Sequence, residues 1–197
     1  EGKADTVVWA HNLGLGRNLL LARELVRACT RRNVRLLSHH HDWWFDNRWL
    51  RCDLKVTALL ANVVARQSAV DQGCAETIFL REGFMIEGAA SNIFVVKDGV
   101  LLAPPKDHRM LPGVTYDVVL ELATQHGVPL EVREIAEAEC RAADELWMTS
   151  STKEVLPITT LDGQPVGHGT NAGKPGPLAQ KMHGWYQQFK DEVMRRG

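Results

Sequence analysis

The sequence lacks several features that would place it in a specialised class of protein. It has no run of about 18 apolar residues, so we expect no membrane-spanning helix. Its 23 basic and 24 acidic residues leave a formal net charge of −1, without the basic excess typical of nucleic-acid binding. The four cysteines are scattered without a CxxC pair, and residues 1–5 contain no apolar core of a signal peptide. These absences predict a cytoplasmic protein with free thiols and with no nucleic-acid or membrane partner.

The remaining composition is that of an ordinary globular protein. Hydrophobic residues make up 45% and charged residues 24% of the 197 residues, which fits one domain, or one domain and a piece, with its own core. Apolar periodicity and turn residues indicate both helices and strands. The expected helices include 57–72, 116–126 and 177–195, and the expected strands include 92–97, 100–103 and 130–135. This mixture predicts an α+β fold.

Three adjacent histidines, His39, His40 and His41, raise the question of a metal site. Consecutive residues on an extended chain point to opposite sides, so adjacent histidines rarely bind one ion. Structural metal sites usually space their ligands along the chain. We therefore predict no native metal, and a metal-binding module remains the weaker alternative.

Lys55 lies at the centre of residues 48–60, where a short predicted strand meets a predicted helix. A lysine amine is a nucleophile only when it has lost its proton, and its ordinary pKa is about 10.4. Partial burial or a nearby cation lowers that pKa, and a junction followed by a largely apolar helix offers such a setting. The alternative for a lone lysine is a surface residue at the start of a helix.

Three further motifs follow the lysine motif along the chain. Residues 51–55 read Arg-Cys-Asp-Leu-Lys, 86–94 contain Glu-Gly-Ala-Ala-Ser-Asn, 111–115 read Leu-Pro-Gly-Val-Thr, and 148–154 are rich in hydroxyl groups. In their order and spacing these motifs resemble the fold-type IV pyridoxal-phosphate enzymes, the class IV aminotransferases. The lysine motif is most similar to that of the D-amino-acid aminotransferase branch.

The resemblance implies a particular domain organisation. Residues 48–197 are expected to form the large, cofactor-binding C-terminal domain of the D-amino-acid aminotransferase-like enzymes, with mixed β structure and packed helices. Members of this family also have a small N-terminal domain, which supplies an arginine to the phosphate and groups that bind the substrate carboxylate. Residues 1–47 match no such domain, so we expect this segment to be atypical or truncated.

The resemblance also implies the cofactor, pyridoxal 5′-phosphate, and two central residues. Lys55 would form the Schiff base and then carry the substrate Cα proton, a role that arginine cannot fill because guanidinium stays protonated. Glu87 would face the pyridine nitrogen and keep it protonated. The alternative for Glu87 is a solvent-facing glutamate in a turn before Gly88.

Four residues are candidates to hold the phosphate. Val114 and Thr115 would do so at a helix N-terminus, with Thr115 capping the helix and Gly113 allowing close backbone approach. A simple helix cap, which needs the same residues, is the alternative. Ser151 and Thr152 would add hydroxyl groups from the other side, or they form a turn rich in serine and threonine.

The remaining candidates surround the cofactor ring. Ser91 and Asn92 either hydrogen-bond around the ring or fix the turn after Glu87. Arg48 and Arg51 would be anion partners near the ring, and surface ion pairing is an equal alternative for both.

The function implied is transamination of D-amino acids with 2-oxo acids, of the D-alanine and 2-oxoglutarate type, by a homodimer. Branched-chain aminotransferase and aminodeoxychorismate lyase are alternatives within the family. A non-catalytic, truncated remnant that binds the cofactor is the alternative outside enzymology, since loss of the small domain would remove one wall of the active site.

Overall fold

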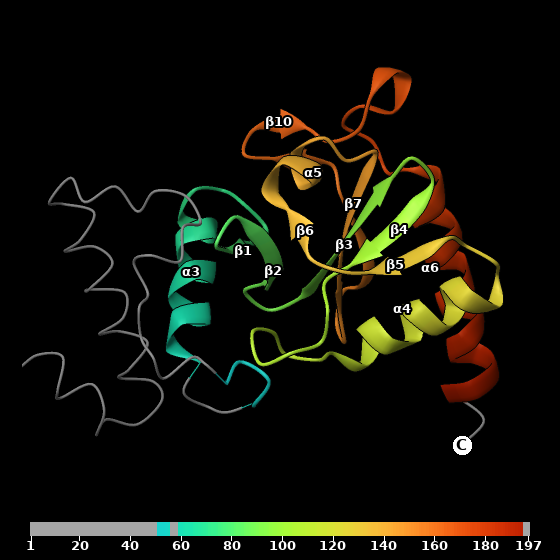
Figure 1. The fold of residues 1–197 in the computed structure, drawn as a ribbon, viewed down its shortest axis with the longest axis horizontal. Coiled ribbons are helices and arrows are strands. Elements are labelled where there is room, and N and C mark those ends of the chain that lie inside the picture. Colours follow the sequence, from blue (N-terminus) through green and yellow to red (C-terminus); the bar gives the residue numbers. More distant parts are fainter. Residues whose placement is uncertain (1–50, 56–58, 195–197) are drawn as a thin grey trace, which may run out of the picture. The chain divides into compact units, whose positions relative to one another are not determined.

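The structure, a computed structural model, describes residues 51–55 and 59–194 (Figure 1). The chain divides into two compact units, the first formed by residues 1–38 and 56–77 and the second by residues 39–55 and 78–197. The segment at 1–50, including its predicted elements, Arg48 and the three adjacent histidines, lies outside the described residues.

The described part of the first unit is built around helix α3, Leu60–Asp71. The helix ends where a glycine is expected to end it: Gln72 is the C-cap, and Gly73 follows with φ +75°, a conformation that favours glycine. The Thr77 hydroxyl donates a 2.9 Å hydrogen bond to the Ala65 carbonyl and fixes the chain after the helix. The predicted helix in this region is confirmed over the described residues.

The second unit contains a five-stranded sheet in the order β5-β4-β3-β7-β8. The strands are β3 (Asn92–Lys97), β4 (Val100–Ala103), β5 (Leu130–Val132), β7 (Glu145–Ser150) and β8 (Glu154–Ile158). The two predicted strands at 92–97 and 100–103 are β3 and β4, and they form a hairpin, because Asp98 (φ +51°) and Gly99 (φ +77°) adopt the two left-handed positions of a tight turn. Strand β5 pairs with β4 in parallel, after the chain has passed through helix α4.

The central strand β3 is buried on both faces, which explains its continuous apolar sequence. Phe94 and Val96 pack on the face covered by helices α4 (Val114–Gln125) and α6 (Pro177–Phe189). These two helices pack against each other, and in the view of Figure 1 they cross. Ile93 and Val95 pack on the opposite face, in a second apolar cluster. The second unit therefore has three layers, with the five-stranded sheet in the middle.

The layer opposite the helices is a three-stranded sheet in the order β1-β2-β6. Its strands are β1 (Ile78–Arg81), β2 (Phe84–Gly88) and β6 (Ile135–Ala136), and the short helix α5 (Glu137–Arg141) follows β6. Strands β9 (Thr160–Leu161) and β10 (Gln164–Pro165) form a separate hairpin, and η4 (Gly169–Asn171) is a short 3-10 helix. This combination of mixed sheets and packed helices confirms the predicted α+β class.

Two predicted elements differ from the structure. The strand expected at 130–135 is two strands in two different sheets, because the chain crosses between them at Arg133 and Glu134. The Arg133 N–H donates to the Ala103 carbonyl at 3.0 Å and holds the crossing. The terminal helix is α-helical only to Phe189 and continues as a π-helical turn, η5 (Lys190–Met194). Across the described part of the chain, no helix has the length and apolar character needed to cross a membrane.

Candidate active site

Glu87 is a buried carboxyl group near the end of β2, with only 6% of its surface exposed. Its Oε2 accepts a 2.9 Å hydrogen bond from the Leu111 N–H. Burial raises the pKa of Glu87 to about 8, and the Leu111 hydrogen bond and the positive charge of Arg81 offset this only in part. The solvent-facing alternative for Glu87 is therefore wrong, and the described residues stabilise its ionised form incompletely.

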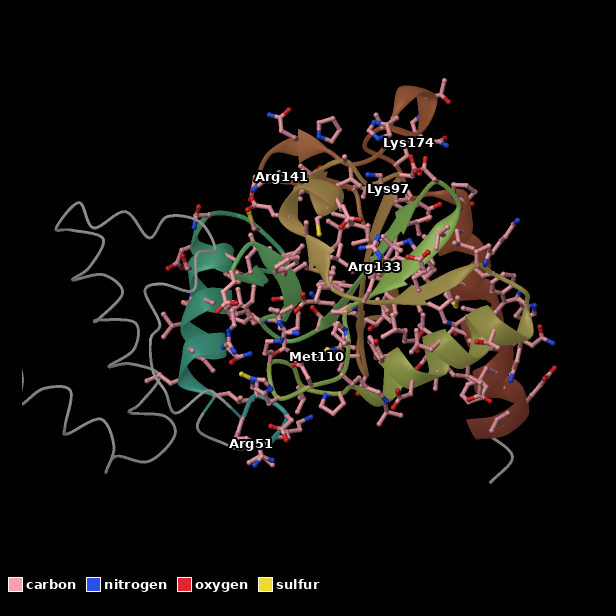
Figure 2. All side chains as sticks on the ribbon, viewed as in Figure 1. Arg51, Lys97, Met110, Arg133, Arg141 and Lys174 are labelled. Atoms are coloured by element: carbon pink, nitrogen blue, oxygen red, sulfur yellow. The ribbon has the colours of Figure 1, made fainter. Side chains whose placement is uncertain are left out.

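The loop at 111–113 lies between Glu87 and Asn92. The Asn92 Nδ2 donates a 2.8 Å hydrogen bond to the Leu111 carbonyl, while the Leu111 N–H is bound by Glu87. A Cβ added at Gly113 would clash with Asn92 Oδ1, so glycine allows the loop to approach this side chain. Met110, just before the loop, lies in the interior of the unit and is 1% exposed (Figure 2). Asn92 thus fixes the loop, and Ser91 accepts a 2.7 Å hydrogen bond from the Gly88 N–H through its carbonyl.

Helix α4 begins directly after this loop, with Gly113 as the N-cap. The expectation that Thr115 caps the helix is wrong, because the helix starts at Val114 and Thr115 is already its second residue. Gly113 has no side chain, so the N-cap residue itself offers no acceptor to the first N–H groups of α4. A helix N-terminus carries free N–H groups and a partial positive charge, so this end is suited to bind an anion.

The hydroxyl-rich turn between β7 and β8 carries Ser151 and Thr152, both exposed. The turn is fixed by a residue just before them: the Ser150 hydroxyl accepts a 3.0 Å hydrogen bond from the Lys153 N–H. The strand leading into the turn places Thr149 opposite Asn92 in the sheet. Ser151 therefore follows by two residues the residue that pairs with Asn92 in the sheet, Thr149.

The lysine motif belongs to the same unit. Residues 51–54 form a turn and a bend, so the strand predicted before Lys55 is wrong over this part. The Cys52 N–H donates a 2.8 Å hydrogen bond to the His108 carbonyl. Burial raises the pKa of the Cys52 thiol, which also lies within the electrostatic reach of Arg81 and Glu87. Lys55 follows Cys52 by three residues and is exposed. The partial burial expected for this lysine is therefore not found among the described residues, and its role stays a prediction.

The arginines near the lysine motif are the predicted anion partners. Arg51 forms an ion pair with Asp53 at 2.8 Å and points outward at the surface (Figure 2). Surface pairing, the alternative for Arg51, is what the structure contains. Arg48 is outside the described residues, so its role stays a prediction. Within residues 51–55 and 59–194, no group of three or more histidine, cysteine or acidic side chains is arranged to hold a metal ion.

Sequence reasoning missed three contributors to this region. Leu111 acts through its backbone, which binds Glu87 on one side and Asn92 on the other. The sequence around Arg81 indicates a turn, so Arg81 is not among the predicted site residues. Ser150 is not among them either, because its neighbour Ser151 is the predicted hydroxyl donor. Backbone contacts of an apolar residue leave no signal in a sequence. Arg81 had a signal, since a buried carboxyl in the next strand needs a nearby cation.

The fold is that of the fold-type IV class of aminotransferases. The family described as amino-transferase class IV matches residues 22–161, so the chain belongs to the class IV aminotransferases. This confirms the predicted family and fold class. Class IV aminotransferases use pyridoxal 5′-phosphate, as the resemblance implied. The match begins ahead of Arg48, and the boundary predicted at 47 and 48 stays a prediction.

Individual relatives come from two branches of the family. A D-alanine aminotransferase from Bacillus licheniformis is 39% identical over 137 residues, which cover 70% of this chain and 47% of the relative. A branched-chain aminotransferase from Thermoproteus uzoniensis, solved with norvaline, is 30% identical with a TM-score of 0.66 and covers 78% of this chain and 49% of that one. A T.th. branched-chain amino acid aminotransferase, solved with N-(5′-phosphopyridoxyl)-L-glutamate, is 30% identical with a TM-score of 0.68, covering 76% and 49%. The chain spans about half the length of these relatives.

Proposed function

We propose that this chain is the cofactor-binding part of a pyridoxal-phosphate-dependent aminotransferase that moves an amino group between a D-amino acid and a 2-oxo acid. The observation that carries the proposal is the buried Glu87 carboxyl, which accepts the Leu111 N–H and has a pKa of about 8. A cation placed beside such a group stabilises it as a carboxylate. A protonated pyridine nitrogen is a cation of this kind.

When bound, pyridoxal phosphate supplies an aldehyde and an electron-accepting ring. The residues of this chain would provide the rest. Lys55 Nζ would hold the aldehyde and, once the substrate amine has replaced it, accept the substrate Cα proton. The Glu87 carboxyl would give its proton to the ring nitrogen and remain as the paired carboxylate. Leu111 and Asn92 would keep Glu87 and the loop beside it in place.

The phosphate would bind at the N-terminus of α4. The backbone N–H groups of Val114 and Thr115 would donate to it, and the exposed hydroxyls of Ser151 and Thr152 would donate from the facing turn. Ser91 lies in the turn that joins Glu87 to Asn92, and it would contact the ring side. Arg48 is proposed as an anion partner on the strength of the family resemblance alone.

Absorbance with added pyridoxal phosphate, followed by borohydride reduction and peptide mapping, tests the cofactor site. We expect an adduct at Lys55 in the unaltered chain and none in Lys55→Ala. Lys174→Ala is the matched control, because Lys174 lies in an exposed loop, where its amine donates to the Thr170 carbonyl (Figure 2). An adduct spread over surface lysines, or one that survives Lys55→Ala, would contradict the proposal.

The substrate class is tested by assays with D-alanine and with L-branched amino acids, each with 2-oxoglutarate. Identity to D-alanine aminotransferases supports the D-amino-acid reaction, while the branched-chain neighbours among solved structures support the second candidate. Activity on L-branched substrates alone would overturn the first candidate. Cofactor binding at Lys55 without turnover of either class would favour a remnant that binds the cofactor and performs no transamination.

We also propose a homodimer in the cytoplasm. The support for a dimer is the family resemblance, and the support for a reducing compartment is the pair of free thiols at Cys74 and Cys140. Sedimentation of the purified chain would test the assembly, and a single species with the mass of one chain would contradict it.

A further inference from the structure

Glu154 has an unusual backbone conformation at the end of the hydroxyl-rich turn. Its φ is +57°, in the left-handed region, where glycine and asparagine fit with less strain than a long side chain. A residue held there is strained, and such residues persist where surrounding contacts fix them. The choice of glutamate at this position therefore calls for a compensating contact.

The compensating contacts come from the C-terminal helix. Gln187 Nε2 donates a 2.6 Å hydrogen bond to Glu154 Oε2, and Lys190 Nζ forms an ion pair with Glu154 Oε1. Lys190 Nζ also donates to Gln187 Oε1 at 3.0 Å, so the three side chains close a ring. The Lys190 and Glu154 side chains are 20% and 25% exposed, which shields the pair from solvent. These hydrogen bonds, that from Lys190 first, lower the pKa of Glu154 and keep it ionised.

One face of this helix makes all the contacts. His183, Gln187 and Lys190 are spaced i, i+4 and i+7, which places them on the same side of a helix. His183 Nδ1 lies 3.3 Å from the carbonyl of Val155, the residue after Glu154. Lys190 is also where the α-helix gives way to the π-helical turn η5, a feature that often accompanies functional sites.

We propose that Glu154, Gln187 and Lys190 form a lock that holds the turn at 150–153 in the conformation that presents the Ser151 and Thr152 hydroxyls to the cofactor phosphate. The inference rests on the proposed function, since that function assigns the phosphate to these hydroxyls. All three lock residues are positioning residues: they act through the turn and touch neither cofactor nor substrate. The lock makes the C-terminal helix a determinant of phosphate affinity.

The lock is tested by comparing two ligands on the full chain, pyridoxal phosphate and pyridoxal, which lacks the phosphate. Glu154→Asn keeps a residue that tolerates the backbone conformation and removes the contacts to Gln187 and Lys190. We expect its dissociation constant for pyridoxal phosphate to rise about tenfold, with that for pyridoxal unchanged within about twofold. An equal change for both ligands, or no change for either, would overturn the lock.

Glu82→Asn is the matched control. Glu82 is also a glutamate with a left-handed backbone, φ +54°, but it is exposed in the turn between β1 and β2. Neither dissociation constant should change in this variant. Lys190→Met should reproduce the selective loss seen in Glu154→Asn, and the double variant should lose no more than either alone. Additive losses would contradict a shared lock.

Hydrogen exchange gives a readout that does not need the cofactor. The Lys153 amide, which is bound by the Ser150 hydroxyl, should exchange faster in Glu154→Asn, while amides in the turn at 98–99 should not. If the unaltered chain forms no adduct at Lys55, the proposed function fails, and the phosphate role of the lock fails with it. If the adduct forms and the preference for pyridoxal phosphate over pyridoxal survives in Glu154→Asn, the lock alone fails.

Discussion

Helices α4 and α6 have similar N-cap residues but differ in what accepts hydrogen bonds from their first N–H groups. Each follows a glycine N-cap in an extended conformation, Gly113 with φ −74° and Gly176 with φ −73°, and neither N-cap residue makes a side-chain capping bond. At α6 a buried carboxylate of the protein occupies the N-terminus. At α4 none of the described residues provides one.

The carboxylate at α6 comes from Glu145 in β7. It accepts hydrogen bonds from the N–H groups of Leu178 (2.9 Å) and Ala179 (2.8 Å), and from Trp147 Nε1 (2.9 Å). Glu87, which is 6% exposed like Glu145, accepts the Leu111 N–H and has a pKa of about 8. The fold itself satisfies the first carboxylate and stabilises the second only in part. The difference supports the proposal that the α4 end binds an anion, whereas the α6 end is structural.

Removing the satisfied carboxylate should have the largest effect on stability. Glu145→Ala leaves three N–H donors without their acceptor in the interior, which we expect to lower the free energy of unfolding by about 4 kcal/mol. Urea denaturation measures this loss. If the variant is as stable as the original chain, the contrast between the two helix ends has no energetic basis.

The partly stabilised carboxyl should make stability depend on pH in the absence of cofactor. Since the pKa of Glu87 is raised to about 8 in the folded chain, the folded state binds the proton more tightly than the unfolded state. Stability contributed by this group is therefore greatest at low pH and falls by about 3 kcal/mol between about pH 5.5 and pH 8. Glu87→Gln should remove this fall and also abolish tight binding of pyridoxal phosphate. Urea titrations at both pH values check the slope, and an unchanged slope in the variant would assign it to another group.

Neither N-cap glycine has a positive φ, so backbone conformation does not require glycine at these positions. Both positions require glycine because a Cβ would clash with a neighbouring side chain. A Cβ at Gly113 would clash with Asn92 Oδ1, so Gly113→Ala should displace the 111–113 loop at a cost of about 1–2 kcal/mol. We expect a weaker affinity for pyridoxal phosphate as well, because α4 starts at this loop. Equilibrium dialysis with the cofactor, beside urea denaturation, would reveal a variant in which stability falls and affinity does not; that result would separate the loop from the binding site.

The smallest effect is expected inside α6. Gly184 has no atom near the place of a Cβ, so Gly184→Ala should raise stability by about 0.5–1 kcal/mol through helix propensity. Thermal unfolding would detect the gain. A loss of stability here would mean that α6 makes a close contact at this glycine, and the comparison of the two helices would need revision.

Local features of the fold were predictable from the sequence, and long-range features were not. The turns at Asp98-Gly99 and Asp162-Gly163 are specified by adjacent residues, and both have the left-handed conformations that such pairs adopt. The apolar pattern at 130–135 is continuous and predicts a single strand. The segment is divided into two strands because its first residues pair with β4 and its last residues pair with β2. These pairing partners are far away in the sequence, so the local pattern does not reveal the division.

The candidate site divides in the same way. Glu87 could be selected from its motif, but its burial and its Leu111 partner depend on a loop 24 residues later. Glu145 carries no motif, and its role as the acceptor at α6 follows from the packing of a strand against a helix 33 residues away. The side chain of Thr115 is suited to a helix cap, but the N-cap of α4 is residue 113. The space beside Asn92 admits only glycine at position 113.

The edge strand β8 bears on how a second chain could attach. It contains Pro157, which pairs with Trp147 on the inner side and has no N–H to offer a strand added on the outer side. The opposite edge, β5, is only three residues long. Neither edge of the five-stranded sheet is a good template for a strand of another molecule, so a second chain that met this sheet should be joined to it by side chains.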